Sequence, residues 1–484
     1  LFRSEYGTPN KSIINGAHSG NSAWITGIND NYAANENSEI TSPCFNFDVD
    51  SLQKPMIKIW INAATFVGID GAVLQYKADD TPWTILGNLN TGINWFNQNN
   101  IVGDPGEQDI QQIIGENKAG WTGFTKDSSW VEVRHSLDSL IGKENIRFRI
   151  AFGSLFEGDT TQSYDGFAFD DIWIGERNKV ALMEHFTNAQ DIDSENSNVA
   201  VDAILQNQFK DVLGIQYHTD FPNEDPLHAF NPGPINSRTL YYSVSNAPYS
   251  IMDGNVYEGT NWTSEMLSLR VLEDPEFDIK LVSSIDGNNT LNVEAEITAL
   301  VDFGKADISC HLAVVENNVS SNNTIYNNVL RAMLPHAGGT TFDQWWYSGQ
   351  SENIAQSYDL NKLNDATNFK VIAFVQDNTS KEVYQAAYND QAYLSTTIAE
   401  QIEEEQSTNF MVYPNPNNGL FNIEFFDNKS HTVVIYNQYG QLVKEFVTNY
   451  NNNSLNLSNV SSGIYHLVIK GEEHMNSQRI IINN

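Results

Sequence analysis

Residues 411–426 read MVYPNPNNGLFNIEFF and predict how the C-terminal part of this 484-residue chain folds. Each proline fixes its own φ and keeps the preceding residue out of the helical region, so Tyr413 and Asn415 are extended. The Asn-Asn-Gly triplet that follows tolerates positive φ and suits a tight turn. The next stretch alternates apolar and polar residues, which places three apolar side chains on one face: Phe421, Ile423 and Phe425. The pattern predicts a stiff entrance followed by a half-buried strand.

Short apolar runs continue from this strand to the end of the chain. They read HTVVIYNQYGQLVKEFV, NSLNLSNVSSGIYHLVIKG and SQRIIIN, and the first of them contains a turn near Tyr439-Gly440. About seven short strands separated by turn residues are typical of a small β-sandwich. Residues 409–484 are therefore predicted to form a compact β-domain.

Four motifs of this domain occur in a diagnostic order: YPNPNNG, VVIYNQYGQLV, LSNVSSGIYHLVI and QRIII. Together they resemble the type A C-terminal sorting domain of the type IX secretion system of Bacteroidetes. An ordinary terminal immunoglobulin-like domain is the alternative, but it explains the strands without explaining the combination of motifs. The residues that carry the resemblance are Tyr413, Pro414, Asn415, Pro416, Gly419, Gly440, Gly463, Tyr465, Arg479, Ile480, Ile481 and Ile482.

The resemblance implies export of the folded chain through the periplasm and across the outer membrane to the cell surface or the medium. The implied partners are the type IX translocon barrel, an outer-membrane shuttle barrel and a sortase-like peptidase. Cleavage by that peptidase is expected upstream of Tyr413, in an acidic linker that contains Glu403, Glu404 and Glu405.

Composition narrows the remaining classes of function. The chain has 26 Lys and Arg against 61 Asp and Glu, a net charge of −35, which repels nucleic acid and anionic lipid alike. No apolar run of about 18 residues occurs, so no transmembrane segment is predicted. The chain begins LFRSEYG, without a methionine or a signal peptide, and we expect a signal peptide, with room for further domains, upstream of Leu1.

The first part of the chain reads as strands and loops. Alternation in WVEVRHSL has the period of a half-buried strand, and similar runs include MIKIWINAATF, NIRFRIAFGS and FAFDDIWIG. The order SAWITG, SPCFNFD, IDGAVLQYKADDTPWTILG and DGFAFDDIWIG resembles the MAM-like jelly-roll domains of extracellular proteins. We therefore expect a jelly-roll sandwich.

A β-α-β pattern follows this segment. VALMEHFTN predicts a strand, apolar residues at helical spacing predict a helix, and LGIQYH predicts a second strand. Pro248, just before a third short strand, is a candidate cis-proline, and the arrangement resembles the thioredoxin fold. The loop where that family has CxxC reads FTNAQDIDSEN, and thiol exchange requires a thiolate, so the domain is predicted to be redox-inactive. It is most similar to an outer-membrane lipoprotein-like family of Bacteroidetes that couples such a domain to a β-sandwich.

From about Asp278 onward the strands have an immunoglobulin-like spacing. The predicted fold class is mainly β and multidomain: a jelly-roll sandwich, a thioredoxin-like α/β domain, an immunoglobulin-like sandwich and a small C-terminal β-sandwich. The expected boundaries are 1–177, 178–275, 276–394, an acidic linker at 395–408, and 409–484.

No HExxH, GxSxG, Walker or dinucleotide motif occurs, so no catalytic and no cofactor-binding residue is predicted. His185, His218 and Asp220 follow the two parallel strands and are candidates for an acid-base or metal site. We favour a simpler interpretation, polar residues at strand ends. Asp70 and Asp170 are the candidate ligands of a structural calcium ion, since calcium prefers oxygen ligands.

Two further features bear on binding and on redox state. Trp95 and Phe96 lie in an asparagine-rich loop and are the candidate contacts to a ligand, a surface glycan or a protein. Cys44 and Cys310 form neither a disulfide framework nor a metal site. We expect two buried free thiols, with an interdomain disulfide as the alternative.

These observations predict a secreted or cell-surface binding protein without catalytic activity, compatible with an adhesin role in attachment or gliding motility. The alternative is the accessory and sorting region of a secreted enzyme, a peptidase or glycan hydrolase, whose catalytic domain precedes Leu1.

Overall fold

The protein is described by a computed structural model, which divides into two compact units, Leu1–Thr396 and Thr397–Asn484. The fold is mainly β with several separate sheets, as predicted. The residues that the structure describes are 4–47, 52–106, 119–155, 164–207, 211–254, 257–259, 263–389, 393–394, 410–415, 417–425, 430–437, 442–448, 452–461, 463–470 and 475–482.

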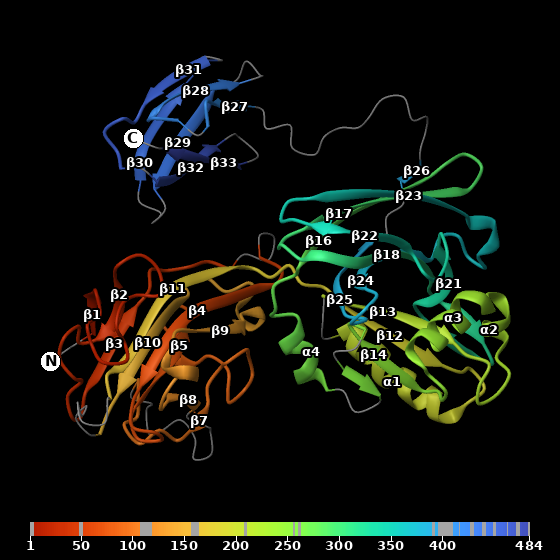
Figure 1. Cartoon of the computed structure of the whole chain (residues 1–484), viewed down its shortest axis with the longest axis horizontal. Helices are drawn as coiled ribbons and strands as arrows, with labels where there is room; N and C mark the ends of the chain where they lie inside the picture. Colours follow the sequence, from red (N-terminus) through yellow and green to blue (C-terminus); the bar gives the residue numbers. More distant parts are fainter. Residues whose placement is uncertain are drawn as a thin grey trace. The chain divides into compact units, whose positions relative to one another are not determined.

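The first segment of the N-terminal unit consists of strands and two short 3-10 helices. They are β1 (Ser4–Gly7), β2 (Ala23–Thr26), β3 (Asn37–Thr41), β4 (Pro55–Ala64), β5 (Gly71–Lys77), β6 (Thr84–Ile85), β7 (Gln98–Asn99), β8 (Ala119–Thr122), η1 (Lys126–Ser128), β9 (Val131–Ser136), η2 (Asp138–Leu140), β10 (Arg147–Gly153) and β11 (Gly166–Glu176). One sheet has the order β1-β2-β11-β4-β9, and the other β3-β10-β5-β8-β7 with β6 beside β5. Buried side chains from both sheets, such as Ile59 and Leu74, share one core, so this segment is a two-layer sandwich (Figure 1).

The second segment of this unit contains all four α-helices of the described residues. Its elements are β12 (Ala181–Thr187), α1 (Ile192–Asn207), β13 (Val212–His218), α2 (Pro226–Phe230), α3 (Pro232–Tyr242), β14 (Tyr249–Met252), β15 (Tyr257–Gly259), α4 (Ser264–Arg270), β16 (Phe277–Ile285), β17 (Thr290–Ala299), β18 (Gly304–Glu316), β19 (Val319–Ser321), β20 (Thr324–Tyr326), β21 (Val329–Leu334), β22 (Thr340–Trp346), β23 (Ser351–Asp359), η3 (Leu360–Lys362), β24 (Phe369–Asp377), β25 (Val383–Asn389) and β26 (Tyr393–Leu394).

The predicted β-α-β pattern is present. Strands β12 and β13 pair in parallel with α1 between them in the sequence, and β14 pairs antiparallel to β12. The sequence prediction did not include α2 and α3, which lie between β13 and β14. Helix α2 begins with a recognisable signal, because Asp225 accepts a hydrogen bond from the Leu227 N–H and Pro226 occupies the first turn.

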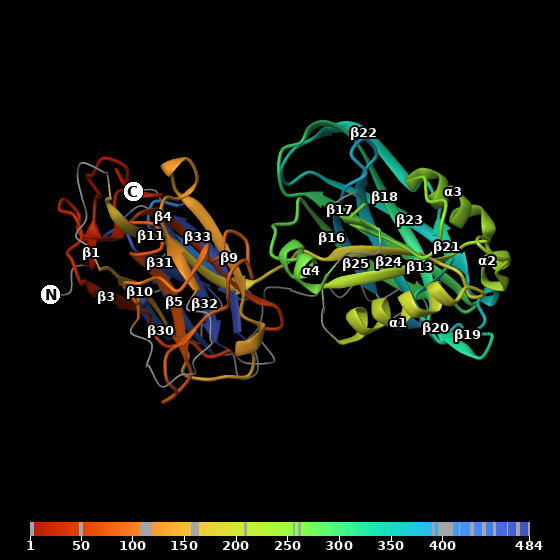
Figure 2. The ribbon, with the colours of Figure 1, turned by 90° about the horizontal axis from the view of Figure 1, so that it is seen from below.

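The α/β strands and the following sandwich share one sheet. Its order is β15-β14-β12-β13-β21-β18-β24-β25, with β22 beside β18, and the junction is the parallel pairing of Gln216 in β13 with Val329 in β21. A second sheet, β23-β17-β16-β26, forms the other layer of the sandwich. Helices α1 to α3 gather at the β12–β13 end, away from β17 and β22 (Figure 1 and Figure 2). The regions expected as separate domains at 178–275 and 276–394 therefore form one continuous body.

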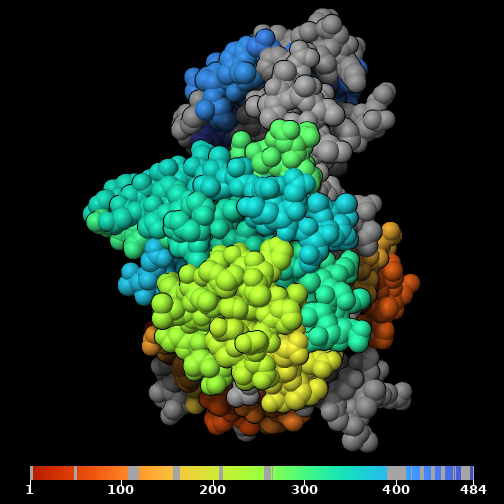
Figure 3. All heavy atoms as spheres, turned by 90° about the vertical axis from the view of Figure 1, so that its right-hand side faces the viewer, coloured from red at the N-terminus to blue at the C-terminus, as the bar shows by residue number. Residues whose placement is uncertain are grey.

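Strand β12 is buried at every position because each of its faces is covered by a different layer. Successive strand residues point to opposite faces. Ala181 and Met183 pack with Val201 of α1, whereas Leu182 and Phe186 pack with residues of the sandwich strands. Atoms from the α/β part and from the sandwich lie against each other on one face of the molecule (Figure 3).

A buried ion pair joins three parts of this body. Arg238 of α3 contacts Glu184 of β12, with its Nη2 atom 2.6 Å and 2.7 Å from the two carboxylate oxygens. The Nη1 atom of Arg238 donates to Gln376 Oε1 of β24 at 3.0 Å. Burial alone would lower the pKa of Arg238, but Glu184, Tyr242 and Tyr217 together outweigh burial and the pKa is raised. Arg238 is therefore charged inside the core, beside the Glu184 carboxylate.

Two tyrosines complete the hydrogen bonding of the Glu184 carboxylate. Tyr217 donates to its Oε1 at 2.8 Å and Tyr242 donates to its Oε2 at 2.6 Å. Burial, and then the nearby Glu184 charge, raise the pKa of both phenols well above the ordinary value. The tyrosines therefore stay protonated and continue to donate to Glu184.

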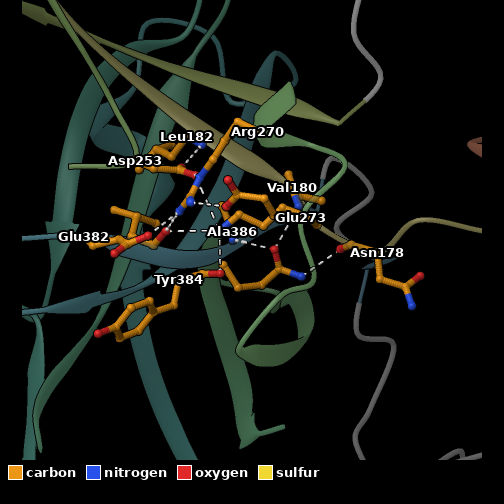
Figure 4. A network of polar contacts seen from close by, with 12 residues as sticks. Asn178, Val180, Leu182, Asp253, Arg270, Glu273, Glu382, Tyr384 and Ala386 are labelled. Atoms are coloured by element: carbon orange, nitrogen blue, oxygen red, sulfur yellow. Dashed lines mark hydrogen bonds and ion pairs between the residues drawn. The ribbon is translucent and has the colours of Figure 1, made fainter. Parts of the chain in front are cut away.

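A second polar network connects β14 and α4 to β25 (Figure 4). Asp253 accepts from Arg270 Nε at 2.6 Å and from the Leu182 N–H at 2.7 Å. Arg270 also donates to Glu382 Oε1 at 2.8 Å and pairs with Glu273. The adjoining turn is tight, since a Cβ on Gly254, whose φ is +79°, would lie 1.6 Å from the Lys381 carbonyl oxygen. Backbone and side chains together hold the α/β strands against the sandwich.

The C-terminal unit is a small two-layer sandwich with its own core. Its strands are β27 (Phe410–Tyr413), β28 (Leu420–Phe425), β29 (His431–Asn437), β30 (Leu442–Thr448), β31 (Asn452–Asn456), β32 (Gly463–Lys470) and β33 (Met475–Ile482). They form the sheets β27-β28-β31 and β30-β29-β32-β33. The predicted buried face of β28 is confirmed, since three of its apolar residues are buried: Phe421, Ile423 and Phe425.

Replacing Arg238 with methionine should lower the free energy of unfolding of the N-terminal unit by about 3–5 kcal/mol, because Glu184 is left charged and unpaired inside the core. Urea titration monitored by circular dichroism measures this loss. Lys305→Met is the matched control, since Lys305 and Asp343 form an exposed pair at 3.2 Å, and it should cost at most about 1 kcal/mol. Equal losses in the two variants would contradict the role assigned to Arg238.

Candidate functional site

The entrance motif YPNPNNG is bound to the last strand of the chain. The Asn415 Oδ1 atom accepts from the Ile481 N–H at 2.8 Å, and the Asn417 N–H donates to the Ile481 carbonyl at 2.9 Å. The motif and the final QRIII run, at opposite ends of the domain sequence, therefore meet in one hydrogen-bonded site. The Tyr413–Pro414 peptide bond is cis, and the Tyr413 hydroxyl donates to Glu424 Oε2 at 3.0 Å.

Gly419 ends the entrance in a conformation that favours glycine. Its φ is +85°, and a Cβ atom there would lie 2.6 Å from both the N and the Cα atom of Ser458. The Gly419 N–H donates to Asn417 Oδ1 at 2.7 Å, and its carbonyl accepts from the Leu457 N–H at 2.6 Å. The motif needs glycine here because both space and backbone conformation exclude a side chain.

The other predicted sorting residues have different environments. Tyr465 is buried and donates from its hydroxyl to the Ser461 carbonyl at 2.7 Å, whereas a Cβ at Gly463 would meet no atom within 4 Å. Ile480 and Ile482 are buried in the core, and Ile481 is half-buried. Arg479 lies in β33. Pro416 and Gly440 fall outside the described residues.

The loop where a thioredoxin would carry its cysteines is held by an asparagine. The side-chain Nδ2 atom of Asn188 donates to the backbone carbonyls of Thr219, Phe221 and Asn223, at 2.9, 3.3 and 2.6 Å. Its Oδ1 atom accepts from the Gln190 N–H at 2.8 Å. One buried amide therefore locks the loops that follow the two parallel strands. The Ala247–Pro248 bond is cis, as the resemblance implied.

His185 is fully enclosed beside this loop. Its Nε2 atom is 2.8 Å from Asn198 Oδ1 and its Nδ1 atom is 2.7 Å from Ser250 Oγ, so both ring nitrogens are engaged. Burial lowers the pKa of His185 to about 4. A neutral imidazole that donates to Asn198 and accepts from Ser250 satisfies this geometry. Such a histidine has no lone pair left for a metal.

His218 pairs with an aspartate other than the one suggested by the sequence. Its Nδ1 atom lies 2.9 Å from Asp225 Oδ2, while Asp220 is exposed at the surface. Burial alone would raise the pKa of Asp225, but hydrogen bonds from His218 and from two backbone N–H groups, those of Ala189 and Leu227, hold it below its ordinary value. The pair is buried and positions the loops on both sides of it. The sequence contains a signal for Asp225, because an aspartate directly before a proline is typical of the start of a helix.

The two calcium candidates are held in separate hydrogen-bond groups. Asp70 accepts from the Tyr32 hydroxyl at 2.9 Å and from the Leu155 N–H at 2.7 Å. Asp170 accepts from the N–H groups of His18 and Ser19, each at 3.1 Å. Within the described part of the chain, no group of three or more His, Cys, Asp and Glu side chains could hold a metal ion. The structural calcium ion stays a prediction.

The prediction that Trp95 and Phe96 contact a ligand is wrong. Their exposed fractions are 1% and 0%. The indole N–H of Trp95 donates to the Leu86 carbonyl at 2.9 Å, and its ring packs 5.0 Å from that of Trp121. The asparagine-rich loop folds inward and contributes its aromatic residues to the sandwich core.

The prediction for the cysteines is correct for one of them. Cys310 is buried and free, and burial raises the pKa of its thiol to about 12. Cys44 is also free, but it is exposed, with the Arg147 Nε atom 2.9 Å from its sulfur. The expectation of a buried thiol at Cys44 is therefore wrong, because Cys44 lies in the loop after β3, where Pro43 and Cys44 are both exposed.

Residues 411–483 match a family described as a secretion system C-terminal sorting domain. No curated protein matches the chain. The solved structure of HBP35 of Porphyromonas gingivalis is 14% identical, covers 64% of this chain and 100% of its own, and has a TM-score of 0.38. A domain of the outer membrane lipoprotein Omp28 from Porphyromonas gingivalis is 16% identical, covers 25% of this chain and 92% of its own, with a TM-score of 0.19. TM-scores this low assign neither a fold nor an activity.

The sorting domain defines the route that the chain takes. It makes the chain a cargo of the type IX secretion system, whose machinery it engages, and directs export through the outer membrane to the cell surface or the extracellular space. Among the described helices, none has the length and apolarity needed to cross a membrane.

Gly419→Ala should destabilise the C-terminal unit by about 2 kcal/mol or more, because a Cβ there combines a left-handed backbone with a clash against Ser458. Pulse proteolysis of the full chain in urea, read by mass spectrometry of the C-terminal fragment, measures this change. Gly463→Ala is the matched control within the same motif set, since open space surrounds that position. Unchanged proteolysis of the Gly419 variant would contradict the structural role.

His185 should make the N-terminal unit acid-sensitive. Its pKa is about 4 in the fold and about 6.5 without it. Between these values the unfolded state binds more protons, so stability falls as pH falls through this window, by about 3 kcal/mol in all. Burial also lowers the pKa of His135 in the same unit to about 4, so His185→Gln should make this slope shallower without removing it, whereas the exposed-site variant His336→Gln should keep it. Urea titrations at a series of pH values test this, and equal slopes in all three proteins would contradict it.

Proposed function

We propose that this chain is a cell-surface or secreted binding protein, an adhesin without catalytic activity, delivered by type IX secretion. The observation that carries the proposal is the enclosed strand-end region, where Asn188, His185 and the His218–Asp225 pair stand in place of a redox motif. All four side chains are buried. Asn188 donates to backbone carbonyls, His185 is hydrogen-bonded to the side chains of Asn198 and Ser250, and His218 is hydrogen-bonded to Asp225. A catalytic site must be open to its substrate, whereas these side chains are enclosed and hold loops together.

The body also presents an aromatic patch, which we define as Leu300, Val301, Trp345 and Tyr347. Trp345 and Tyr347 are each 58% exposed. Two hydrogen bonds connect the segment after β22 to the loop that contains Leu300 and Val301. The Ser348 N–H donates to Asp302 Oδ1 at 2.7 Å, and the Ser348 hydroxyl donates to the Leu300 carbonyl at 2.9 Å. Exposed aromatic faces stack on the apolar faces of sugars. The patch supports a surface glycan as the ligand.

Strand geometry explains why two adjacent tryptophans differ in exposure. Successive side chains of β22 alternate between the two faces, so Trp346 points inward and is fully buried, 5.2 Å from Phe277. Trp345 points outward. A tryptophan that points outward from a rigid strand loses little conformational entropy when it contacts a ligand.

The partners of export are the translocon barrel, the shuttle barrel and a sortase-like peptidase that cleaves upstream of Tyr413. We propose that the chain interacts with each of these partners, and the match of residues 411–483 to the sorting family supports this. Loss of surface exposure in a host that lacks the translocon barrel supports this route, and unchanged exposure overturns it.

A glycan array probed with purified residues 1–394 tests the binding function. We expect binding to a restricted set of glycans, and Trp345→Ala should weaken it at least about tenfold because one stacking face is lost. Trp173→Ala is the matched control, since Trp173 is also exposed but is contacted by Lys58, whose Nζ atom is 5.2 Å from its ring. Hydrolysis of peptide or glycoside substrates by the same protein, or binding that both variants retain in full, would overturn the proposal.

A further inference from the structure

A cavity of about 850 Å³ lies between the helices α2 and α3 and the sandwich strands β21 and β23. The apolar part of its lining includes Met333, Leu334 and Pro335, and its helical side includes Phe230. Two cationic side chains also line it, Arg331 and Lys362. The cavity is separate from the strand-end region and from the aromatic patch described above.

Arg331 is a buried cation whose hydrogen bonds are incomplete. Its Nε atom donates to Glu316 Oε2 at 2.5 Å, and the side chains of both residues are almost fully enclosed. The Nη1 and Nη2 atoms of Arg331 have no hydrogen-bond partner among the described residues. Native proteins rarely leave buried charged donors unpaired, because the lost hydration is not replaced. These two nitrogens are the part of the cavity lining that lacks a partner.

The unpaired donors have the geometry of a carboxylate receptor. The two Nη groups of a guanidinium form a planar fork that matches the two oxygens of a carboxylate. The local charges favour a monoanion over a phosphate dianion, since Arg331 and Lys362 are balanced by Glu316 and Asp359. Apolar walls next to this fork suit an acid with a hydrocarbon or aromatic body.

Phe230 covers the guanidinium. Its ring centroid is 4.2 Å from the Arg331 Cζ atom, and the Phe230 side chain is itself 38% exposed and lines the cavity. Phe230 is the last residue of the five-residue helix α2, next to Asn231, whose side chain donates to the Arg331 carbonyl at 2.7 Å. A half-exposed ring at a helix end can turn aside without opening the main core.

We propose that this cavity binds a small organic carboxylate, with the acid group on Arg331, the apolar body against Met333 to Pro335, and Phe230 turning aside to admit it. Lys362 adds a second positive charge at the cavity wall. Its Nζ atom lies 5.7 Å from the ring of Tyr358, which also lines the cavity.

Isothermal titration calorimetry of the full chain with benzoate tests the proposal. We expect one benzoate per chain and at least about tenfold weaker binding of benzamide, which has the same body without the charge. Inorganic phosphate should compete poorly. Failure of benzoate to bind the folded chain at millimolar concentration, or equal affinity for benzamide, would overturn the proposal.

Variants locate the site and distinguish a loss of binding from a loss of folding. Lys362→Gln should weaken benzoate severalfold, whereas Lys370→Gln, which removes an equivalent lysine 5.5 Å from the ring of Tyr388 outside the cavity, should not. Phe230→Ala should tighten binding because the cover is gone. The double variant Glu316→Gln with Arg331→Met avoids an unpaired buried charge and should abolish binding while keeping the urea unfolding transition. Trp345→Ala, outside the cavity, should leave benzoate affinity unchanged. Unchanged benzoate binding in the double variant, or equal effects of the two lysine variants, would overturn the assignment of the site.

Discussion

The contact between Arg238 and Glu184 is the constraint on which the second segment of the N-terminal unit depends. It joins a helix, a central parallel strand and, through Gln376, a strand of the sandwich. A charge pair in a core is tolerated only when every donor and acceptor has a partner, since breaking one leaves the other desolvated. Here Tyr217 and Tyr242 supply the missing hydrogen bonds. The network therefore specifies one packing of the α/β strands against the sandwich.

This packing has consequences for function. Sandwich strands cover one face of the sheet that contains β12 and β13, and the ends of these two strands are closed by Asn188. The α/β part is consequently built into a larger body. The binding surfaces that we propose lie elsewhere, on the outward face of β22 and in the cavity beside Arg331. Both lie on elements that the shared sheet holds in place.

Several elements were predictable because their signals are local. The alternation in residues 420–425, the β-α-β pattern and the four sorting motifs each lie within a short window. Helix α3 was missed because its buried residues are Ile235, Arg238 and Thr239, so the usual apolar period is absent. Trp95 and Phe96 were misjudged because a polar loop can still turn its aromatic residues inward. The Asp225 partner of His218 was predictable as a helix cap, but not as a partner of that histidine.

The sequence by itself determined the export route of the protein, since the sorting motifs are contiguous stretches that can be identified without knowledge of the fold. It also predicted the absence of a CxxC pair from residues 186–196, because no cysteine occurs in that stretch. Only the tertiary structure decided that two expected domains share a sheet and that Asn415 meets Ile481. It also decided that the Nη1 and Nη2 atoms of Arg331, beside a cavity, lack a hydrogen-bond partner among the described residues. Each of these depends on residues far apart in the chain. Their proximity follows from burial and hydrogen-bond satisfaction over the whole core, which no local pattern records.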